Sequence, residues 1–273
     1  MLFVEFLVYR LNKSSSNKIK AYLALVENGL AKDAEQAKSM LSCGLVFSGD
    51  TKLTSSSCID KDDLAKGTLR VKYTKPYVSR GAIKLETVFK EHTIKVEGFR
   101  CADIGASTGG FTQLLLERGA DLVFAVDVAK GVLDYKIRID EKVVVMEEIN
   151  ARLFDKYEIV NKNIPKESLD LVVFDLSFIS LKMVVPVVLP YVKKGGYVIP
   201  MIKPQFEATK NEVGDNGVVR DSGVVTRILD DMKVFFCSHG LTFLGLTASQ
   251  IKGPSGNQEY FYIMQKDSLN QLR

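Results

Sequence analysis

The sequence has no tryptophan and only two histidines, and its four cysteines show no CxxC spacing. Structural zinc sites need clustered cysteine and histidine ligands, so these scarcities argue against a metal centre. Cys43, Cys58, Cys101 and Cys237 are expected to be free thiols of a reducing compartment. No apolar run approaches the ~20 residues that span a bilayer, and the apolar N-terminus lacks the marks of a signal peptide. We therefore expect a cytoplasmic protein without stable membrane association.

The composition sets wider bounds. With 273 residues, 46% of them hydrophobic, the chain is long enough for one large domain or two unequal ones. A formal net charge of +4 is too small to indicate a nucleic-acid partner by itself. The distribution of charged residues is therefore more informative than their sum.

Residues 1–74 are rich in lysine and serine and predict a small α+β domain with its core from about residue 18. Helical spacing of apolar residues runs from Ile19 to Val26, and a second helix is expected from Ala34 to about Ser42. Residues 45–47 and 68–73 have the character of strands. The resulting order is helix, helix, strand and strand.

Pro76 marks a boundary, because a proline biases the residue before it to an extended backbone. We take residues 75–78 as a linker and 79–273 as a second domain in which apolar strands alternate with helices. This alternation predicts a doubly wound, Rossmann-like α/β domain with a parallel sheet. Its seven expected strands cover residues 100–104, 122–126, 143–146, 169–174, 196–201, 241–248 and 260–264.

A glycine-rich segment from Asp103 to Gly110 lies where the first of these strands should turn into a helix. Such turns bind nucleotide-like cofactors in α/β sheets. Ser107 replaces the middle glycine of the dinucleotide fingerprint, which favours S-adenosylmethionine, although the loop alone leaves both cofactors open. Asp103 is placed to meet the amino group of the methionine part. Asp127, at the end of the next strand, suits ribose hydroxyls and otherwise a helix cap.

Four charged residues, far apart in sequence, form a candidate catalytic set: Lys84, Asp175, Lys203 and Glu259. Asp175 and Lys203 end the fourth and fifth expected strands. Strand ends of a doubly wound sheet open at one edge, so these two side chains are expected to be neighbours. Each residue taken singly is more typical of a surface salt bridge.

This Lys, Asp, Lys, Glu set resembles the FtsJ-like ribose 2′-O-methyltransferases. The whole arrangement resembles the TlyA or hemolysin A-like family, in which an S4 RNA-binding domain precedes such a methyltransferase. One departure is Asp215, where the family pattern has a lysine, and another is Lys18-Ile-Lys20 in place of Arg-Leu-Asp. The resemblance is carried by residues 77–85, 103–112, 150–152, 175–180, 202–207, 217–221 and 254–260.

The resemblance implies methylation of a ribose 2′-hydroxyl, most often of cytidine, in ribosomal RNA or ribosomal subunits. Lys203 would take the proton as a neutral amine or stabilise the oxyanion as an ammonium, and Asp175 would orient it. Lys84 would add positive charge, and Glu259 would position Lys84 or the ribose. The expected cofactor-binding residues are Asp103, Gly105, Ala106, Ser107, Gly109, Gly110, Phe111, Asp127, Val128, Asn150 and Asp175. The expected RNA-binding residues are Lys18, Lys20, Lys32, Lys38 and Arg80.

Several interpretations stay open. Asn150 and Arg152 suit the adenine end of a cofactor or the RNA entrance, and also a loop cap, while Phe178 and Phe206 suit a nucleobase or the core. A dinucleotide-dependent oxidoreductase is disfavoured by Ser107 and by the lack of a Tyr-x-x-x-Lys motif. A membrane-active protein, suggested by the hemolysin name, needs an apolar or strongly amphipathic surface segment that the sequence does not show.

Overall fold

The computed structural model describes residues 17–42, 44–71, 77–214 and 216–267. The chain forms two compact units, Met1–Pro76 and Tyr77–Arg273. The expected N-terminal extension lies outside the described residues, as do part of the expected linker and Asp215. Within the described ranges, no helix is long and apolar enough to cross a membrane.

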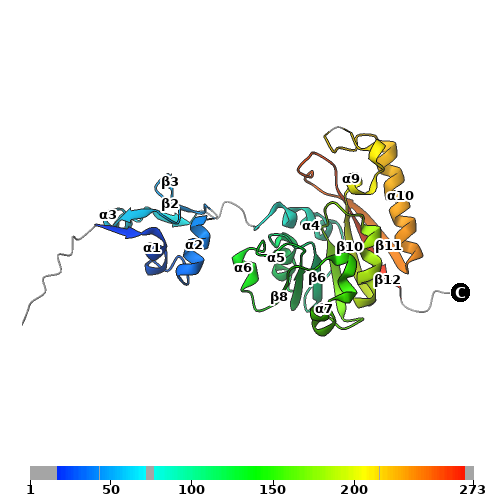
Figure 1. The fold of residues 1–273 in the computed structure, drawn as a ribbon, viewed down its shortest axis with the longest axis horizontal. Coiled ribbons are helices and arrows are strands. Elements are labelled where there is room, and N and C mark those ends of the chain that lie inside the picture. The colour runs from blue at the N-terminus through cyan, green and yellow to red at the C-terminus, as the bar shows by residue number, and fades with distance from the viewer. Residues whose placement is uncertain (1–16, 43, 72–76, 215, 268–273) are drawn as a thin grey trace, which may run out of the picture. The chain divides into compact units, whose positions relative to one another are not determined.

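The first unit packs two helices against short strands (Figure 1). The second helix matches its expected bounds, but the first begins later, because Ile19 lies in a strand and pairs with Ile59. Ile19 is flanked by exposed lysines, and this alternation fits a strand with one face inward. The elements are β1 (Lys18–Lys20), α1 (Ala21–Glu27), α2 (Ala34–Ser42), β2 (Val46–Ser48), β3 (Thr51–Lys52), β4 (Cys58–Asp60), α3 (Lys61–Ala65) and β5 (Leu69–Val71).

The second unit is built on a seven-stranded sheet in the order β11-β12-β10-β9-β6-β7-β8. The sequence-based bounds of five strands are confirmed, and β10 and β12 are longer than expected. The expectation of a parallel sheet is wrong for one strand, since β12 runs antiparallel to both β10 and β11. The reason is that no helix separates β11 from β12. The strands are β6 (Arg100–Ile104), β7 (Leu122–Val126), β8 (Val143–Met146), β9 (Leu169–Phe174), β10 (Val192–Ile202), β11 (Leu241–Ala248) and β12 (Tyr260–Lys266).

Helices cover both faces of this sheet, as Figure 1 shows. Successive strand side chains point to opposite faces, so Val172 packs against one helical layer and Val173 against the other. The helices α4 (Arg80–Glu91) and α5 (Gly110–Glu117) form one layer. The opposite layer contains α7 (Glu158–Asn163), α8 (Val185–Val188) and α10 (Ser222–Ser238). The result is the predicted doubly wound α/β architecture.

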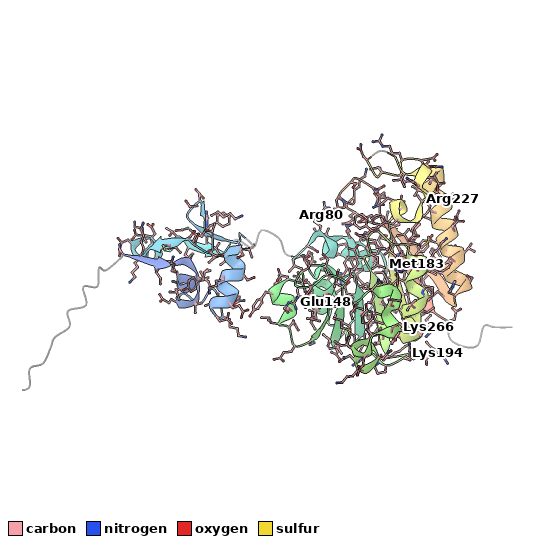
Figure 2. All side chains as sticks on the ribbon, viewed as in Figure 1. Arg80, Glu148, Met183, Lys194, Arg227 and Lys266 are labelled. Carbon is pink, nitrogen blue, oxygen red and sulfur yellow. The ribbon has the colours of Figure 1, made fainter. Side chains whose placement is uncertain are left out.

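The remaining short elements lie in the connections of the second unit. Among them, α9 (Pro204–Glu207) lies just beyond the end of β10 (Figure 1). Arg80, at the start of α4, and Lys194, near the start of β10, lie at opposite ends of the unit (Figure 2). The others are α6 (Tyr135–Arg138), η1 (Ala151–Lys156), η2 (Leu181–Met183), η3 (Leu189–Tyr191) and η4 (Lys210–Glu212).

Candidate functional site

Four charged side chains gather at the carboxyl ends of neighbouring strands. Asp103 is the second-to-last residue of β6, and Asp127, Asp175 and Lys203 directly follow β7, β9 and β10. Because these strands are parallel neighbours in the sheet, their carboxyl ends meet at one edge. The sheet itself therefore brings together residues that are 100 positions apart in sequence.

The glycine-rich turn after β6 allows its backbone to approach the end of β9. Gly105 has φ +91°, and a Cβ atom at this position would lie 2.6 Å from the carbonyl oxygen of Asp175. Any side chain would therefore push the Asp175 backbone away. Gly110 likewise allows the start of α4 to come close. A Cβ atom at Gly110 would lie 2.1 Å from Oγ of Ser79, the residue that caps α4. The two glycines are needed for close packing around the site.

A cavity of about 450 Å³ opens beside this turn. Its wall includes six of the expected cofactor residues, and it also includes Arg152 and Phe178. Asp175 is the one member of the catalytic set in the wall. The six are Gly105, Ser107, Asp127, Val128, Asn150 and Asp175.

The other expected cofactor residues do not line this cavity. Phe111 is buried in the hydrophobic core, where its ring centroid is 6.0 Å from that of Phe261. Ala106 packs in a small apolar cluster with Leu133. Ala106, Gly109, Gly110 and Phe111 thus shape or support the turn from behind.

Asp103 is fully buried, and one of its oxygens is held by α5. Its Oδ2 accepts hydrogen bonds from Thr112 N at 2.9 Å and from Thr112 Oγ1 at 2.7 Å. Its Oδ1 has no partner among the described residues. Burial raises the pKa of Asp103 to about 7; the Thr112 hydrogen bonds oppose this rise, and the negative charges of Asp175 and Asp127 add to it. A cationic donor at Oδ1 would satisfy this oxygen and stabilise its charge.

Asn150 acts as a loop cap and also lines the cavity, whereas Asp127 caps no helix and instead holds the backbone of two loops. Asp127 Oδ2 accepts a hydrogen bond from Ser107 N at 2.7 Å, and its Oδ1 accepts one from Ala129 N at 2.8 Å. Asn150 caps η1 through Arg152 N. Both side chains nevertheless line the cavity. Carboxylate and amide oxygens have further lone pairs, so both residues can still accept hydrogen bonds from a ligand.

The charges around the cavity fit a cationic cofactor. Asp127 and Asp175 form part of its wall, and both act electrostatically on buried Asp103. Three carboxylates favour a ligand with a sulfonium and an ammonium group and disfavour the pyrophosphate of a dinucleotide. The residues present therefore fit S-adenosylmethionine.

The buried ammonium group of Lys203 contacts two residues of the segment that follows β9. Its Nζ lies 2.6 Å from Asp175 Oδ1 and 3.0 Å from Ser177 Oγ. Lys203 and Asp175 are therefore neighbours, as their strand ends predict. Ser177 also lines the cavity. Lys203 thus contacts two residues of the cavity wall without lining the cavity itself.

A second buried ion pair joins Lys84 Nζ of α4 to Glu259 Oε2 at 2.5 Å. Only 8% of the Lys84 side chain and 1% of the Glu259 side chain are exposed. Tyr260 pairs with Ile202 in the antiparallel ladder of β12 and β10. Glu259 directly precedes β12, and Lys203 directly follows β10. Because the two strands are antiparallel, both residues lie at the same end of the sheet. The reversed strand β12 thereby brings the second pair to the first.

Two polar residues near the site were missed by the sequence interpretation. Ser177 binds Lys203, and Thr112 binds Asp103. Ser177 could have been found from its position two residues after Asp175, because a bent segment there can bring both side chains to Lys203. Thr112 carries no comparable signal, because only the buried approach of α5 to β6 shows its role.

The expected RNA-binding residues are all exposed. Arg80 begins α4, in the helix that carries Lys84 (Figure 2). The four lysines lie in the first unit, where Lys38 Nζ lies 5.0 Å from the centre of the Tyr22 ring. Phe178 is 91% exposed, and its ring centroid is 5.1 Å from that of Phe206. This exposed ring is therefore no part of the core.

Residues 77–266 match the model of the FtsJ-like methyltransferase family. The chain is 39% identical over 237 residues, 87% of its length and 86% of the relative's, to the 16S/23S rRNA (cytidine-2'-O)-methyltransferase TlyA of Mycobacterium tuberculosis. It is 38% identical over 234 residues, 85% of its length and 93% of the relative's, to Hemolysin A of Brachyspira hyodysenteriae. A solved structure described as "Putative hemolysin from Streptococcus thermophilus" is 36% identical, with a TM-score of 0.66, covering 92% of this chain and 89% of that one.

These similarities extend over most of the chain and agree with the geometry of the site. The class of reaction is methyl transfer, which removes the dinucleotide-dependent oxidoreductase as an alternative. The chain belongs to the FtsJ-like methyltransferase family, with S-adenosylmethionine as its cofactor.

Proposed function

We propose that this protein methylates the ribose 2′-hydroxyl of a cytidine in ribosomal RNA, in the cytoplasm and on ribosomal subunits or their RNA. The rRNA (cytidine-2'-O)-methyltransferase activity that names the Mycobacterium tuberculosis relative supports this choice of substrate. The observation that carries the proposal is the 2.6 Å contact between buried Lys203 and Asp175, which lines the cofactor cavity. A ribose hydroxyl needs such a charged group to become a nucleophile.

The cofactor would be held by the carboxylates around the cavity. Bound S-adenosylmethionine supplies an electrophilic methyl group on a cationic sulfur. Asp127 is placed to accept hydrogen bonds from the ribose hydroxyls of the cofactor, beside the exposed side chain of Val128. The unpartnered Oδ1 of Asp103 suits the ammonium group of the methionine part. Asn150 lies in the wall on the side of Asp127 and suits the adenine.

Lys203 would act on the attacking oxygen. Lys203 Nζ is held 2.6 Å from the Asp175 carboxylate, and we propose that the side chain acts by stabilising negative charge as it develops on the 2′-oxygen. Asp175 and Ser177 together fix the direction of the Lys203 side chain. Because Asp175 also lines the cavity, the same carboxylate couples the cofactor compartment to the nucleophile.

Lys84 and Glu259 would complete the electrostatics. A second ammonium group near the first one raises the local positive potential, which favours an oxyanion. Glu259 holds Lys84 in one position, since both side chains are almost fully buried. Removing either partner would leave a buried charge without its counterion, a change that costs about 3–5 kcal/mol.

The first unit is proposed to be an S4-like RNA-binding domain within residues 1–74. Its helix and strand order supports this assignment, and the 237 residues that match the Mycobacterium tuberculosis relative are more than the second unit contains. Lys18, Lys20, Lys32 and Lys38 would contact RNA phosphates, and Arg80 would do so from the catalytic unit. Phe178, exposed at the cavity wall, would stack on a nucleobase of the substrate.

Replacing Lys203 tests the catalytic assignment. We expect Lys203→Ala to lower methylation of ribosomal subunits at least about 100-fold, because one charged donor in the transition state is worth roughly that much. Calorimetric affinity for S-adenosylmethionine should be unchanged. Lys203→Arg keeps the positive charge but cannot act as a base, so it should retain part of the activity.

Lys193 offers a matched control at the other end of the same strand. Its Nζ lies 2.6 Å from Asp170 Oδ1, which reproduces the geometry of the Lys203 pair away from the site. Lys193→Ala should methylate at the wild-type rate. Retained methylation by Lys203→Ala, or an equal loss with both variants, would contradict the role of Lys203.

The raised pKa of Asp103 predicts a pH dependence of cofactor binding. In the free protein this pKa is about 7, whereas contact with an ammonium group favours the ionised carboxylate. Affinity for S-adenosylmethionine should therefore increase as pH rises toward 7, and binding should release a proton. Below pH 7 the affinity should fall by up to about tenfold per pH unit. Calorimetry in two buffers with different ionisation heats measures the proton. The Asp103→Asn variant should bind S-adenosylmethionine more weakly and release fewer protons. Proton release equal to that of the wild-type protein would refute the contact.

Two pairs of lysines in the first unit test the S4 proposal at equal change of charge. The slope of log affinity for RNA against log salt concentration should become shallower by roughly 1.5 when Lys20 and Lys32 of the full chain are replaced with glutamine. The reason is that each phosphate contact contributes about 0.7–0.9 to this slope. Replacing exposed Lys61 and Lys66 should leave the slope unchanged. Equal slopes for both variants would show that Lys20 and Lys32 do not bind phosphate.

A further inference from the structure

Glu207 is a half-buried carboxylate that none of the steps above uses. It is the last residue of α9, and it reaches across to the segment that follows β9. Its Oε1 accepts a hydrogen bond from Leu181 N at 2.8 Å, and its Oε2 accepts one from Ser180 Oγ at 2.5 Å. Burial raises the pKa of Glu207, and these two hydrogen bonds oppose the rise. One carboxylate thus binds two adjacent residues of another segment.

The segment bound in this way carries the substrate side of the site. Asp175, Ser177 and Phe178 all line the cavity and lie just before the residues that Glu207 binds. The same segment is tied a second time by Lys203, through Asp175 and Ser177. Lys203 directly precedes α9 and Glu207 ends it, so the two ties join both ends of this short helix to residues 175–181.

Phe178 lies between the two ties and has a strained backbone. Its φ of +63° is in the left-handed region, which is unfavourable for a large side chain. Such a conformation persists only where the surroundings impose it. Ser177, the residue before Phe178, is held by Lys203, and Ser180, two residues after it, is held by Glu207. The two anchors therefore account for the orientation of Phe178, whose ring meets Phe206 of α9 at 5.1 Å.

The hydroxyl of Ser180 makes the contact directional. It donates to Glu207 and accepts a hydrogen bond from Lys182 N at 3.2 Å, which caps η2. The two donors belong to the adjacent residues Ser180 and Leu181. The carboxylate therefore fixes the orientation of this segment as well as its distance from α9. A single hydrogen bond would fix the distance alone.

We propose that Glu207 is a positioning residue for the RNA substrate: it holds residues 175–181 against α9, so that Phe178 faces the target nucleotide and Ser177 faces Lys203. This inference rests on the proposed function for its substrate, but the contact itself is independent of it. Glu207 does not touch the cavity, which distinguishes it from the residues that bind the cofactor.

Steady-state kinetics of the full chain on ribosomal subunits test the proposal. Glu207→Ala should raise KM for the RNA at least fivefold and lower kcat, with a smaller loss of affinity for S-adenosylmethionine, since only part of the cavity wall belongs to residues 175–181. Glu207→Gln should recover most of both constants, because its amide oxygen still accepts from Leu181 N and its amide NH2 can donate to Ser180 Oγ. A variant that merely destabilised the unit would instead lose cofactor affinity and active fraction together.

Glu212 provides the matched control. It accepts hydrogen bonds from Thr209 N and Thr209 Oγ1, both at 2.8 Å, and pairs with Arg227. Arg227 lies on α10 (Figure 2). Glu212→Ala therefore removes a comparable set of contacts close by in sequence without touching residues 175–181. It should leave KM for RNA within twofold of the wild-type value. A KM for Glu207→Ala equal to that of Glu212→Ala would overturn the proposal.

Amide hydrogen exchange gives a second measurement that needs no activity. The Leu181 amide is bonded to Glu207, so its exchange, with that of Lys182, should accelerate at least tenfold in Glu207→Ala and stay unchanged in Glu212→Ala. Unchanged exchange in Glu207→Ala would overturn the positioning role. If the wild-type protein methylated no ribosomal RNA, the proposed function would fail, and exchange alone would decide whether Glu207 holds the segment.

Discussion

The ion pair between buried Lys203 and partly exposed Asp175 is the interaction on which the site depends. Burying two charges costs free energy unless their geometry is good and their remaining hydrogen-bonding groups are satisfied. Here the ends of β9 and β10 set the 2.6 Å contact, and Ser177 accepts a further hydrogen bond. A pair of this kind contributes little to stability compared with apolar packing, so its presence at the cavity wall is best explained by its chemistry.

The opposite charges of the site are divided between two compartments. The carboxylates of Asp127 and Asp175 line the cavity, and their negative charges, added to burial, raise the pKa of Asp103 at the end of β6. Lys203 directly follows β10 and contacts Asp175, and Lys84 lies in α4; neither lysine lines the cavity. A cationic methyl donor and a developing oxyanion thus each find charges of opposite sign, and Asp175 stands between them.

The sequence predicts the sheet of the second unit well, because its strands are short apolar runs with clear breaks. It predicts the adjacency of Asp175 and Lys203 for the same reason, since parallel strand ends converge. It does not predict the reversed direction of β12, which brings Glu259 to Lys203, because a seven-residue apolar strand has the same pattern in either direction. Thr112 and Glu207 were also beyond it: their partners lie in other segments, and only packing of α5 and α9 brings them into contact. In the first unit, the isolated apolar Ile19 suits a helix or a strand equally, and pairing with Ile59 decides it.

The central claim is that a ribose oxygen of RNA receives the methyl group. The most direct measurement incubates the purified protein with unmodified ribosomal subunits and methyl-labelled S-adenosylmethionine, digests the RNA to nucleosides and identifies the labelled product by mass spectrometry. We predict label on the ribose of cytidine, so that the label leaves with the sugar when the glycosidic bond of the nucleoside breaks. Label that remains on a base, or label found only in protein, would contradict it.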